Sequence, residues 1–246
     1  YTTLFRSPDR RSIVQAALRL CELGDLGTRY PHELSGGQNQ RVALARALAP
    51  GYPIILLDEP LASLDADLRA QLSGDLRRLL KESGRTAVLV THDQDEAFQI
   101  ADRVGVLRHG HLEQIGTPEE IYHAPATRFV ATFVGEADFL PGVARADGIH
   151  TEIGVFPDGH PCPGRGCVDV VVRPEYVQVV PDLTGQAVVT ARRFRGAGFL
   201  YEIRLRSGRC LRSHQPSTHS LPTGTLVSVH ATCRRVATFT ALDSQS

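Results

Sequence analysis

The stretch Leu34-Ser35-Gly36-Gly37-Gln38, together with two polar motifs that follow it, decides the fold. Twenty residues after Gln38 an apolar run ends in Asp58-Glu59-Pro60, and a later apolar run ends in Thr91-His92-Asp93. Open α/β sheets bind ligands outside the carboxyl ends of their strands. The two polar motifs therefore predict functional groups at the ends of two strands.

The Ser-Gly-Gly motif has the chemistry of an anion site. Ser35 offers a hydroxyl, and Gly36 and Gly37 let the backbone approach a phosphate closely. We expect a helix over 37–49, whose N-terminus would present free N–H groups and a partial positive charge. For an isolated motif of this kind, the alternative is a glycine-containing helix cap without a ligand.

The second and third motifs carry groups suited to phosphoryl transfer. In such reactions one carboxylate helps to hold Mg²⁺, a role that fits Asp58, and a neighbouring group orients the attacking water. Glu59 can accept the proton of that water, and His92 is placed to reach a phosphate and steady the water. The alternative is that the adjacent acids only end a strand and that the histidine is structural.

Hydrophobic periodicity predicts alternating helices and strands in the N-terminal half. Helices are expected at 12–23, at 37–49, after a cap at Asp65, and from Asp93 through Gln99. The apolar runs 54–57 and 86–90 are typical of strands that are buried on both faces of a parallel sheet. Such alternation favours an α/β layer architecture.

After residue 104 the pattern of predicted elements changes in two steps. His109-Gly110 predicts a hairpin turn, and Thr117-Pro118-Glu119-Glu120 predicts a helix start. After about residue 135, short β-rich runs indicate a small barrel or sandwich, with a domain boundary near Ala137. These runs are 168–172, 177–180, 187–190, 199–205 and 226–229.

Composition narrows the classes of function. The 246 residues can hold one large or two ordinary domains, and 27 basic residues balance 27 acidic ones, so no overall field attracts nucleic acid or anionic lipid. No apolar stretch approaches the roughly 20 residues that span a bilayer, so any membrane link must run through a partner. The five cysteines are scattered, unlike a disulfide framework. Cys162 and Cys167, with His160, supply too few ligands for a typical zinc site, so we read them as a reduced loop.

From about Arg11 to Phe139, the motifs and their order resemble the second half of an ABC importer ATPase. In that resemblance 34–38 is the signature loop, the strand ending at Asp58-Glu59 is the Walker B strand, 61–65 is the D-loop, and His92 is the switch histidine. The β-rich remainder resembles the OB-like (TOBE) regulatory domain of the same branch. The implied fold class is α/β, a partial P-loop NTPase domain followed by a small all-β OB-like domain.

The resemblance also implies roles for single residues. ATP would be contacted by Ser35, Gly36, Gly37, Gln38 and Asp65. Mg²⁺ would be held by Asp58, and Glu59 and His92 would be catalytic. The family more often has Ser at the position of Ala62 and Ala or Asn at the position of Ser63 in this D-loop. We regard this exchange of small residues as tolerated.

One family motif is missing from the sequence. It contains no G-x-x-x-x-G-K-[ST] phosphate loop. Residues 1–7 match the translation of a common sequencing adapter, and we expect them to be an artefact rather than a native loop. The expected division is thus 1–7, an ATPase half over 8–137 and a regulatory domain over 138–246. We expect this N-terminally truncated chain alone to lack ATPase activity and to aggregate through poorly buried faces such as 54–57.

Weaker cues resemble ferric-iron importers within this branch, namely 133–142, 194–196 and 215–217. The implied partners are a second ATPase subunit in a homodimer, membrane permease subunits and, indirectly, a periplasmic or surface solute-binding protein. The implied location is peripheral, on the cytoplasmic face of the inner membrane. Polyamine, sulfate and sugar importers share this architecture and remain alternatives.

Two other classes are weighed against transport. An ABC ATPase of DNA repair or translation, without a membrane partner, would not be expected to carry this C-terminal β domain. OB folds often bind oligonucleotides, and Arg192-Arg193-Phe194-Arg195 mixes basic and aromatic side chains. The zero net charge argues against that function, so we expect no nucleic-acid partner.

Overall fold

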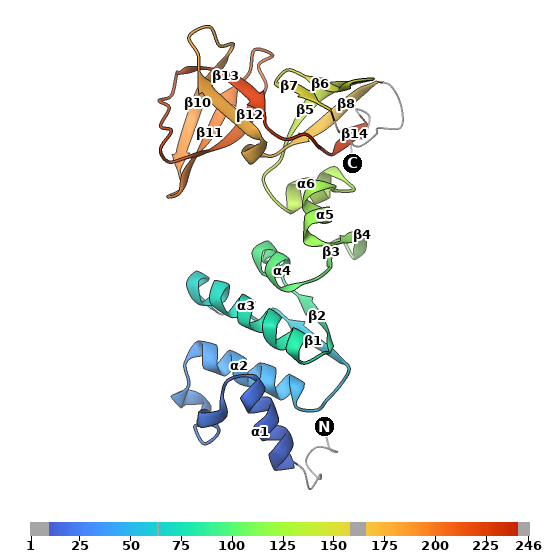
Figure 1. Cartoon of the computed structure of the whole chain (residues 1–246), viewed down its shortest axis with the longest axis vertical. Helices are drawn as coiled ribbons and strands as arrows, with labels where there is room; N and C mark the ends of the chain where they lie inside the picture. The colour runs from blue at the N-terminus through green and yellow to red at the C-terminus, as the bar shows by residue number, and fades with distance from the viewer. Residues whose placement is uncertain (1–9, 63, 158–165, 241–246) are drawn as a thin grey trace. The chain divides into compact units, whose positions relative to one another are not determined.

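The computed structural model describes residues 10–62, 64–157 and 166–240 (Figure 1). The chain divides into two compact units, Tyr1–Val104 and Gly105–Ser246. The expected boundary near Ala137 concerns where the ATPase resemblance ends, and it stays a prediction. The expectations for 1–7, Ser63 and Cys162 lie outside the described residues.

The first unit alternates helices and strands as expected. Its elements are α1 (Arg10–Leu20), the 3-10 turns η2 (Gly24–Leu26) and η3 (Pro31–Glu33), α2 (Gly36–Leu48), β1 (Ile54–Asp58), α3 (Ala66–Glu82), β2 (Thr86–Val90) and α4 (Gln94–Ile100). Helix α1 ends earlier than expected. After Leu20 the chain turns so that Cys21 and Leu23 are buried, which shows tertiary packing overriding helical periodicity.

Strands β1 and β2 form a parallel pair joined through α3, the β-α-β arrangement of an α/β fold (Figure 1). Their register runs from Ile54 opposite Thr86 to Asp58 opposite Val90. One face of the pair packs on the helices, in a core that includes Ile55, Leu44, Leu48, Leu76 and Leu79.

The other face of this pair is exposed. Ile54, Leu56, Val88 and Val90 are 57, 75, 47 and 56% exposed. The expectation of strands buried on both faces is therefore wrong for this chain, because its helices cover only one side. The expectation of a poorly buried apolar face at 54–57 is confirmed for Ile54 and Leu56.

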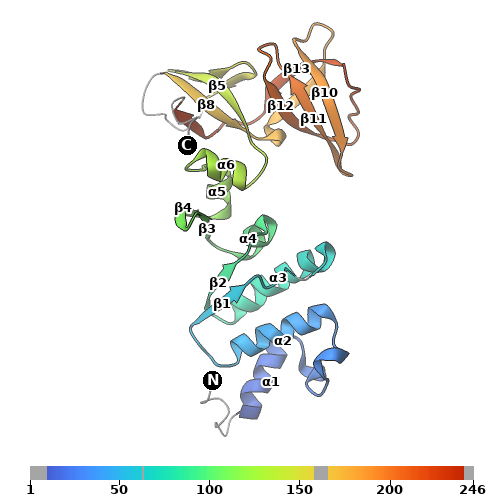
Figure 2. The same cartoon turned by 180° about the vertical axis from the view of Figure 1, so that it is seen from behind.

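The second unit opens with a hairpin and two short helices, and continues with strands (Figure 2). Its elements are β3 (Val104–Arg108, starting at the division), β4 (His111–Gly116), α5 (Pro118–His123), α6 (Arg128–Phe133), β5 (Asp138–Arg145), β6 (Gly148–Thr151), β7 (Gly154–Phe156), β8 (Cys167–Val172), the 3-10 turn η4 (Pro174–Tyr176), β9 (Val177–Pro181), β10 (Ala187–Phe194), β11 (Gly198–Arg204), β12 (Cys210–Pro216), β13 (Leu226–Ala231) and β14 (Thr238–Thr240). His109 and Gly110 both have positive φ, as a tight hairpin turn requires.

Two antiparallel five-stranded sheets, in the orders β12-β11-β10-β13-β9 and β14-β8-β5-β6-β7, share one core. Leu140, Phe156 and Val170 come from one sheet, and Tyr201 and Val227 from the other. The expectation of a small all-β domain is confirmed. All five predicted runs are strands, whereas β5, β6, β7, β12 and β14 were not predicted.

A buried arginine fastens the residues before Ala137 to these sheets. Arg173 is 1% exposed, and its guanidinium donates to the carbonyl oxygens of Ala131, Glu136 and Tyr122. It also lies 4.1 Å from the centre of the Tyr122 ring. These bonds explain why α5 and α6 belong to the second compact unit. In the part of the chain that the structure describes, no helix is both long and apolar enough to cross a membrane.

Candidate functional site

The signature loop is a closed helix cap. Ser35 precedes α2, its hydroxyl accepts from the Gln38 N–H at 3.3 Å, and the Gln38 side chain accepts from the Ser35 N–H at 3.0 Å. The first N–H groups of a helix have no partner inside it. The N–H groups of Gly36 and Gly37 are thus the ones that this turn can offer to an anion.

Glu59 and His92 meet at the carboxyl ends of β1 and β2. The Glu59 N–H donates to the carbonyl oxygen of Val90 at 2.8 Å, and Glu59 Oε1 lies 2.8 Å from His92 Nδ1. The hydrogen bond to Glu59, aided by its negative charge, raises the pKa of His92. The structure therefore pairs the two residues that were predicted to be catalytic.

Two features set Glu59 apart from an ordinary strand-end acid. Its φ is +45°, in the left-handed region that costs a non-glycine residue roughly 1–2 kcal/mol. Its Oε2 atom is buried and has no hydrogen-bond partner among the described residues. Strain of this kind persists only where the surroundings enforce it, and it clusters at functional sites.

Asp58 ends β1 and lines a hollow of about 230 Å³ between α2, β1 and α3. Among residues 10–62, 64–157 and 166–240, no group of three or more His, Cys, Asp or Glu side chains is arranged to hold a metal ion. Mg²⁺ commonly uses one or two carboxylates together with substrate phosphates and water. Asp58 fits that mode as a single protein ligand.

Asp65 caps α3, with its carboxylate accepting from the Leu68 N–H at 2.9 Å. A side-chain carbon at Gly36 would lie 3.8 Å from Leu64, so the signature loop lies beside the residue that precedes Asp65. Arg69 extends this link, because it donates to the Leu64 carbonyl at 3.0 Å and to the Asp93 carboxylate at 2.6 Å.

The predicted site residues thus fall into two groups within the first unit. Glu59 and His92 are in direct contact. The signature loop lies beside the D-loop residue Leu64 instead. In the described part of the chain, no hydrogen bond joins Ser35 or Gln38 to Glu59 or His92.

Sequence reasoning missed Arg69 and Glu96. Glu96 is 2% exposed and accepts from the Thr91 hydroxyl at 2.6 Å. Burial raises the pKa of its carboxyl. Asp93-x-x-Glu96 has the spacing of a capping box, in which the acid would bind the cap N–H. Here the Thr91 hydroxyl accepts that N–H instead, so the pattern was a usable signal for Glu96.

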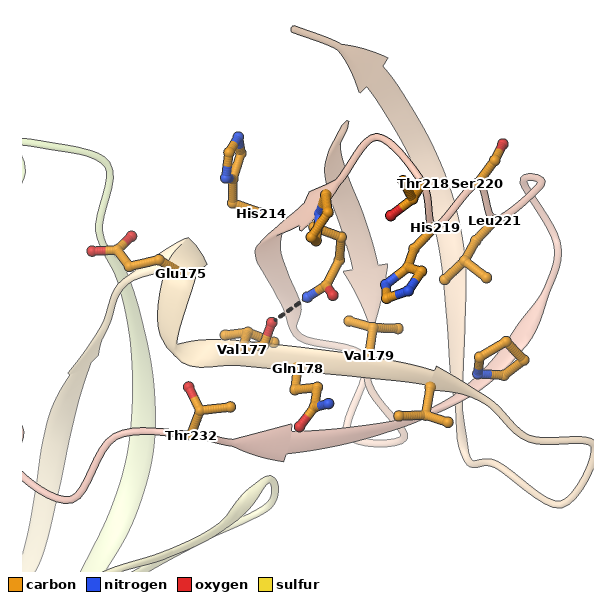
Figure 3. A pocket seen from close by; sticks show the side chains of 14 residues that line it. Glu175, Val177, Gln178, Val179, His214, Thr218, His219, Ser220, Leu221 and Thr232 are labelled. Atoms are coloured by element: carbon orange, nitrogen blue, oxygen red, sulfur yellow. Dashed lines mark hydrogen bonds between the residues drawn. The ribbon is translucent and has the colours of Figure 1, made fainter. Parts of the chain in front are cut away.

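A second hollow, of about 720 Å³, lies in the C-terminal unit and is shown in Figure 3. It is lined by β9 and by residues 214–216 and 218–221, and His214, His219 and Leu221 are labelled in Figure 3. The Gln215 amide donates to the carbonyl oxygen of Val177 at 2.8 Å. Gln215 and Pro216 belong to the cues that resemble iron importers. None of the predicted ATP, Mg²⁺ or catalytic residues lines this hollow.

Comparison with known families gives two matches. Residues 2–62 match the family described as ABC transporter, and residues 170–239 match the TOBE domain. The first match starts inside the segment 1–7, whose origin stays a prediction. The second covers strands of the β-rich unit.

Curated relatives are import ATP-binding proteins with different solutes. The sulfate/thiosulfate import protein CysA of Xanthomonas campestris is 46% identical over 74% of this chain and 52% of its own length. The spermidine/putrescine import protein PotA of Pseudomonas fluorescens is 44% identical over 80% of this chain and 58% of its own. The Fe(3+) ions import protein FbpC of Brucella abortus is 38% identical over 95% of this chain and 68% of its own.

The chain therefore spans between about half and two thirds of the length of these relatives. Among solved structures, CbiO1 from Clostridium perfringens, part of the ABC transporter complex CbiONQ, is 33% identical and covers 47% of each chain with a TM-score of 0.44.

Proposed function

Because the chain belongs to the import ATP-binding proteins of ABC transporters that carry a TOBE domain, we propose that it is part of an ATP-hydrolysing importer subunit. The observation that carries this proposal is the contact of 2.8 Å between Glu59 and His92 at the carboxyl ends of two parallel strands. A carboxylate paired with an imidazole at this edge can orient a water molecule and accept its proton.

Each residue has a proposed task. Glu59 accepts the proton of the attacking water, and His92 holds that water against the terminal phosphate of ATP. The capped turn at Ser35 and Gln38 presents helix N–H groups to a phosphate. Asp65, the residue after the neighbouring Leu64, would also contact ATP. Asp58 would hold Mg²⁺, which neutralises phosphate charge when bound.

The separation of the two groups supports a site that is shared between subunits. In the family, the signature loop of one subunit faces ATP held by the phosphate loop of the other. The turn at Gly36 lies against Leu64 instead of the Glu59–His92 pair, which suits that arrangement. We propose a homodimer that drives membrane permease subunits from the cytoplasmic face, with a solute-binding protein acting indirectly.

The test is Glu59→Gln in a full-length subunit that contains this chain. The variant keeps size and hydrogen bonding but removes the proton acceptor. ATP should still bind, while turnover falls by the roughly 10²–10⁴-fold that is typical of a lost general base. Glu82→Gln, an exposed acid at the end of α3, is the control and should keep turnover. Near-normal turnover in Glu59→Gln would reject Glu59 as the base.

Ferric iron is the solute that we propose. The support is coverage, because the similarity to the Fe(3+) ions import protein extends over 95% of this chain and includes the β-rich unit. Sulfate or polyamine is the second candidate, favoured by the higher identities of 46 and 44% over shorter spans.

Growth separates these solutes. Cells that lack the full-length gene should grow poorly under iron limitation, and excess iron or the restored gene should rescue them. A gene copy with Glu59→Gln should not rescue growth. A defect that is cured by polyamine or sulfate would replace the iron assignment and leave the ATPase proposal standing.

A further inference from the structure

The exposed side chain of His92 does not hold the turn between β2 and α4 in place. The His92 side chain is 78% exposed, and its ring contacts Glu59. Its position is therefore set by the backbone between β2 and α4, where Thr91 and Asp93 flank it on either side.

A closed ring of hydrogen bonds surrounds this turn. The Thr91 hydroxyl donates to Glu96 Oε2 at 2.6 Å and accepts from the Asp93 N–H at 3.0 Å. The Glu96 N–H donates to Asp93 Oδ1 at 3.0 Å and closes the ring. In the sequence, His92 lies between Thr91 and Asp93, which are two members of this ring.

The ring is anchored on its outer side. Asp93 Oδ2 accepts from Arg69 at 2.6 Å, and Arg69 also holds the Leu64 carbonyl of the D-loop. The bond from the Glu96 N–H, together with Arg69, lowers the pKa of Asp93, so the cap stays charged.

The burial of Glu96 costs free energy of folding. It is 2% exposed, and its Oε1 atom has no hydrogen-bond partner among the described residues. A buried polar group without a partner costs about 1–3 kcal/mol. An ordinary capping box would avoid this cost, because its acid binds the cap N–H directly. In this protein the carboxylate of Glu96 instead accepts from the hydroxyl of Thr91, the residue next to His92.

We propose that Glu96 is a positioning residue, whose carboxyl acts through the Thr91 hydroxyl to fix the turn that presents His92 to Glu59. Its effect on ATP hydrolysis rests on the proposed function, whereas its effect on the His92–Glu59 contact does not. The Glu96 side chain acts as a hydrogen-bond acceptor for Thr91, so glutamine should replace it and an apolar side chain of similar size should not.

The experiment compares four test variants and one control variant of the full-length subunit. Glu96→Leu removes the acceptor at similar volume, and Thr91→Val removes the hydroxyl. Glu96→Gln and Thr91→Ser keep the hydrogen bond. Asp95→Ala removes an exposed acid from the same helical turn and is the control.

Two readouts are measured. The first is the ¹⁵N shift of the His92 ring, assigned by its loss in His92→Ala, which distinguishes a hydrogen-bonded Nδ1 from a free one. It should change in Glu96→Leu and Thr91→Val and stay as in the unmodified protein in the other variants. The second is kcat, which should fall about 10- to 100-fold in the same two variants with the KM for ATP nearly unchanged, as expected for misplacement of a reacting group.

The proposal and the proposed function fail separately. If the unmodified subunit does not hydrolyse ATP, the proposed function fails, and the His92 ring shift still decides the role of Glu96. An unchanged ring shift in Glu96→Leu would overturn the positioning role. So would a fall in kcat from Glu96→Leu that is as large in a His92→Ala background as in the unmodified subunit. If Glu96→Leu does not fold, the matched pair Thr91→Val and Thr91→Ser gives the same decision.

Discussion

The parallel strands β1 and β2 and the antiparallel strands of the C-terminal unit are built from similar apolar residues, yet they end in different environments. Leu56 and Val88 lie on an exposed face, 75 and 47% exposed. Val170 and Val227 are fully buried between two sheets. Apolar strands therefore do not determine their own burial.

The difference arises from what covers each sheet. The two five-stranded sheets bury each other's inner faces in one core, so this unit supplies its own cover. The β1–β2 pair has helices on one face only. Contiguous exposed apolar surface marks an interaction site or an aggregation liability. We therefore expect the stability of the C-terminal unit to depend on its core. We expect the solubility of the first unit to depend on what covers its exposed face.

The largest expected effect is on the C-terminal core. Phe156 is fully buried, and Phe156→Ala should lower the free energy of unfolding of this unit by about 3–5 kcal/mol. Val155→Ala, at a 43% exposed position of the same strand, should cost less than about 1 kcal/mol. Urea denaturation followed by far-UV circular dichroism measures both. Equal effects would show that the two sheets do not share a sealed core.

The next largest effect is expected on the packing of residues 105–137 against the β-rich strands. Arg173→Leu removes the donor to three carbonyl oxygens, those of Ala131, Glu136 and Tyr122. Removing a buried charge relieves desolvation, but buried acceptors left without a donor cost about 1–3 kcal/mol, so we expect a net loss of stability.

A glutamate-specific protease reports this change locally, because Glu119 and Glu120 lie in α5. Cleavage there should accelerate in Arg173→Leu and stay unchanged in the control Arg145→Leu, which alters an exposed arginine of β5. Unchanged cleavage in Arg173→Leu would mean that α5 is held by other contacts.

A smaller effect on stability, with a larger one on solubility, is expected at the open face of β1. Leu56→Gln should change the free energy of unfolding by no more than about 0.5 kcal/mol, because the position is exposed. It should reduce aggregation of this chain in static light scattering. Ile55→Gln, at a 4% exposed position on the covered face, is the matched control and should destabilise the unit. If Leu56→Gln aggregates like the parent chain, this face does not drive aggregation.

The smallest expected effect is on the pH dependence of the His92–Glu59 pair. The pKa of His92 is raised, so the folded state binds this proton more tightly than the unfolded state does. The stabilisation is therefore complete below the unfolded pKa and disappears as the pH rises through the folded pKa. Glu59→Gln should lower the pKa of His92 towards its ordinary value, as read by NMR titration of its ring. A pKa that stays raised in Glu59→Gln would exclude Glu59 as the cause.

Local sequence patterns predicted the elements that are stabilised by interactions between residues close in sequence. Asp65, Asp93 and Thr117 each cap a helix as expected, because a cap is a hydrogen bond between residues close in sequence. The strands β5 and β12 were missed. In β5, Pro141 and Gly142 interrupt the alternation, and in β12 the partly polar run 210–216 is held by pairing with β11.

The sequence by itself determined the α/β and all-β halves, the helix caps and the motifs that carry Glu59 and His92, because these follow from residue chemistry and short spacing. Only the tertiary structure decided the contact between Glu59 and His92, the burial of Glu96, the buried position of Arg173 and the exposure of the β1–β2 face. Each of these depends on groups that are distant in sequence or on the direction of a side chain within a turn. Burial and hydrogen bonding at such places are set by the packing of neighbouring elements, which no local pattern encodes.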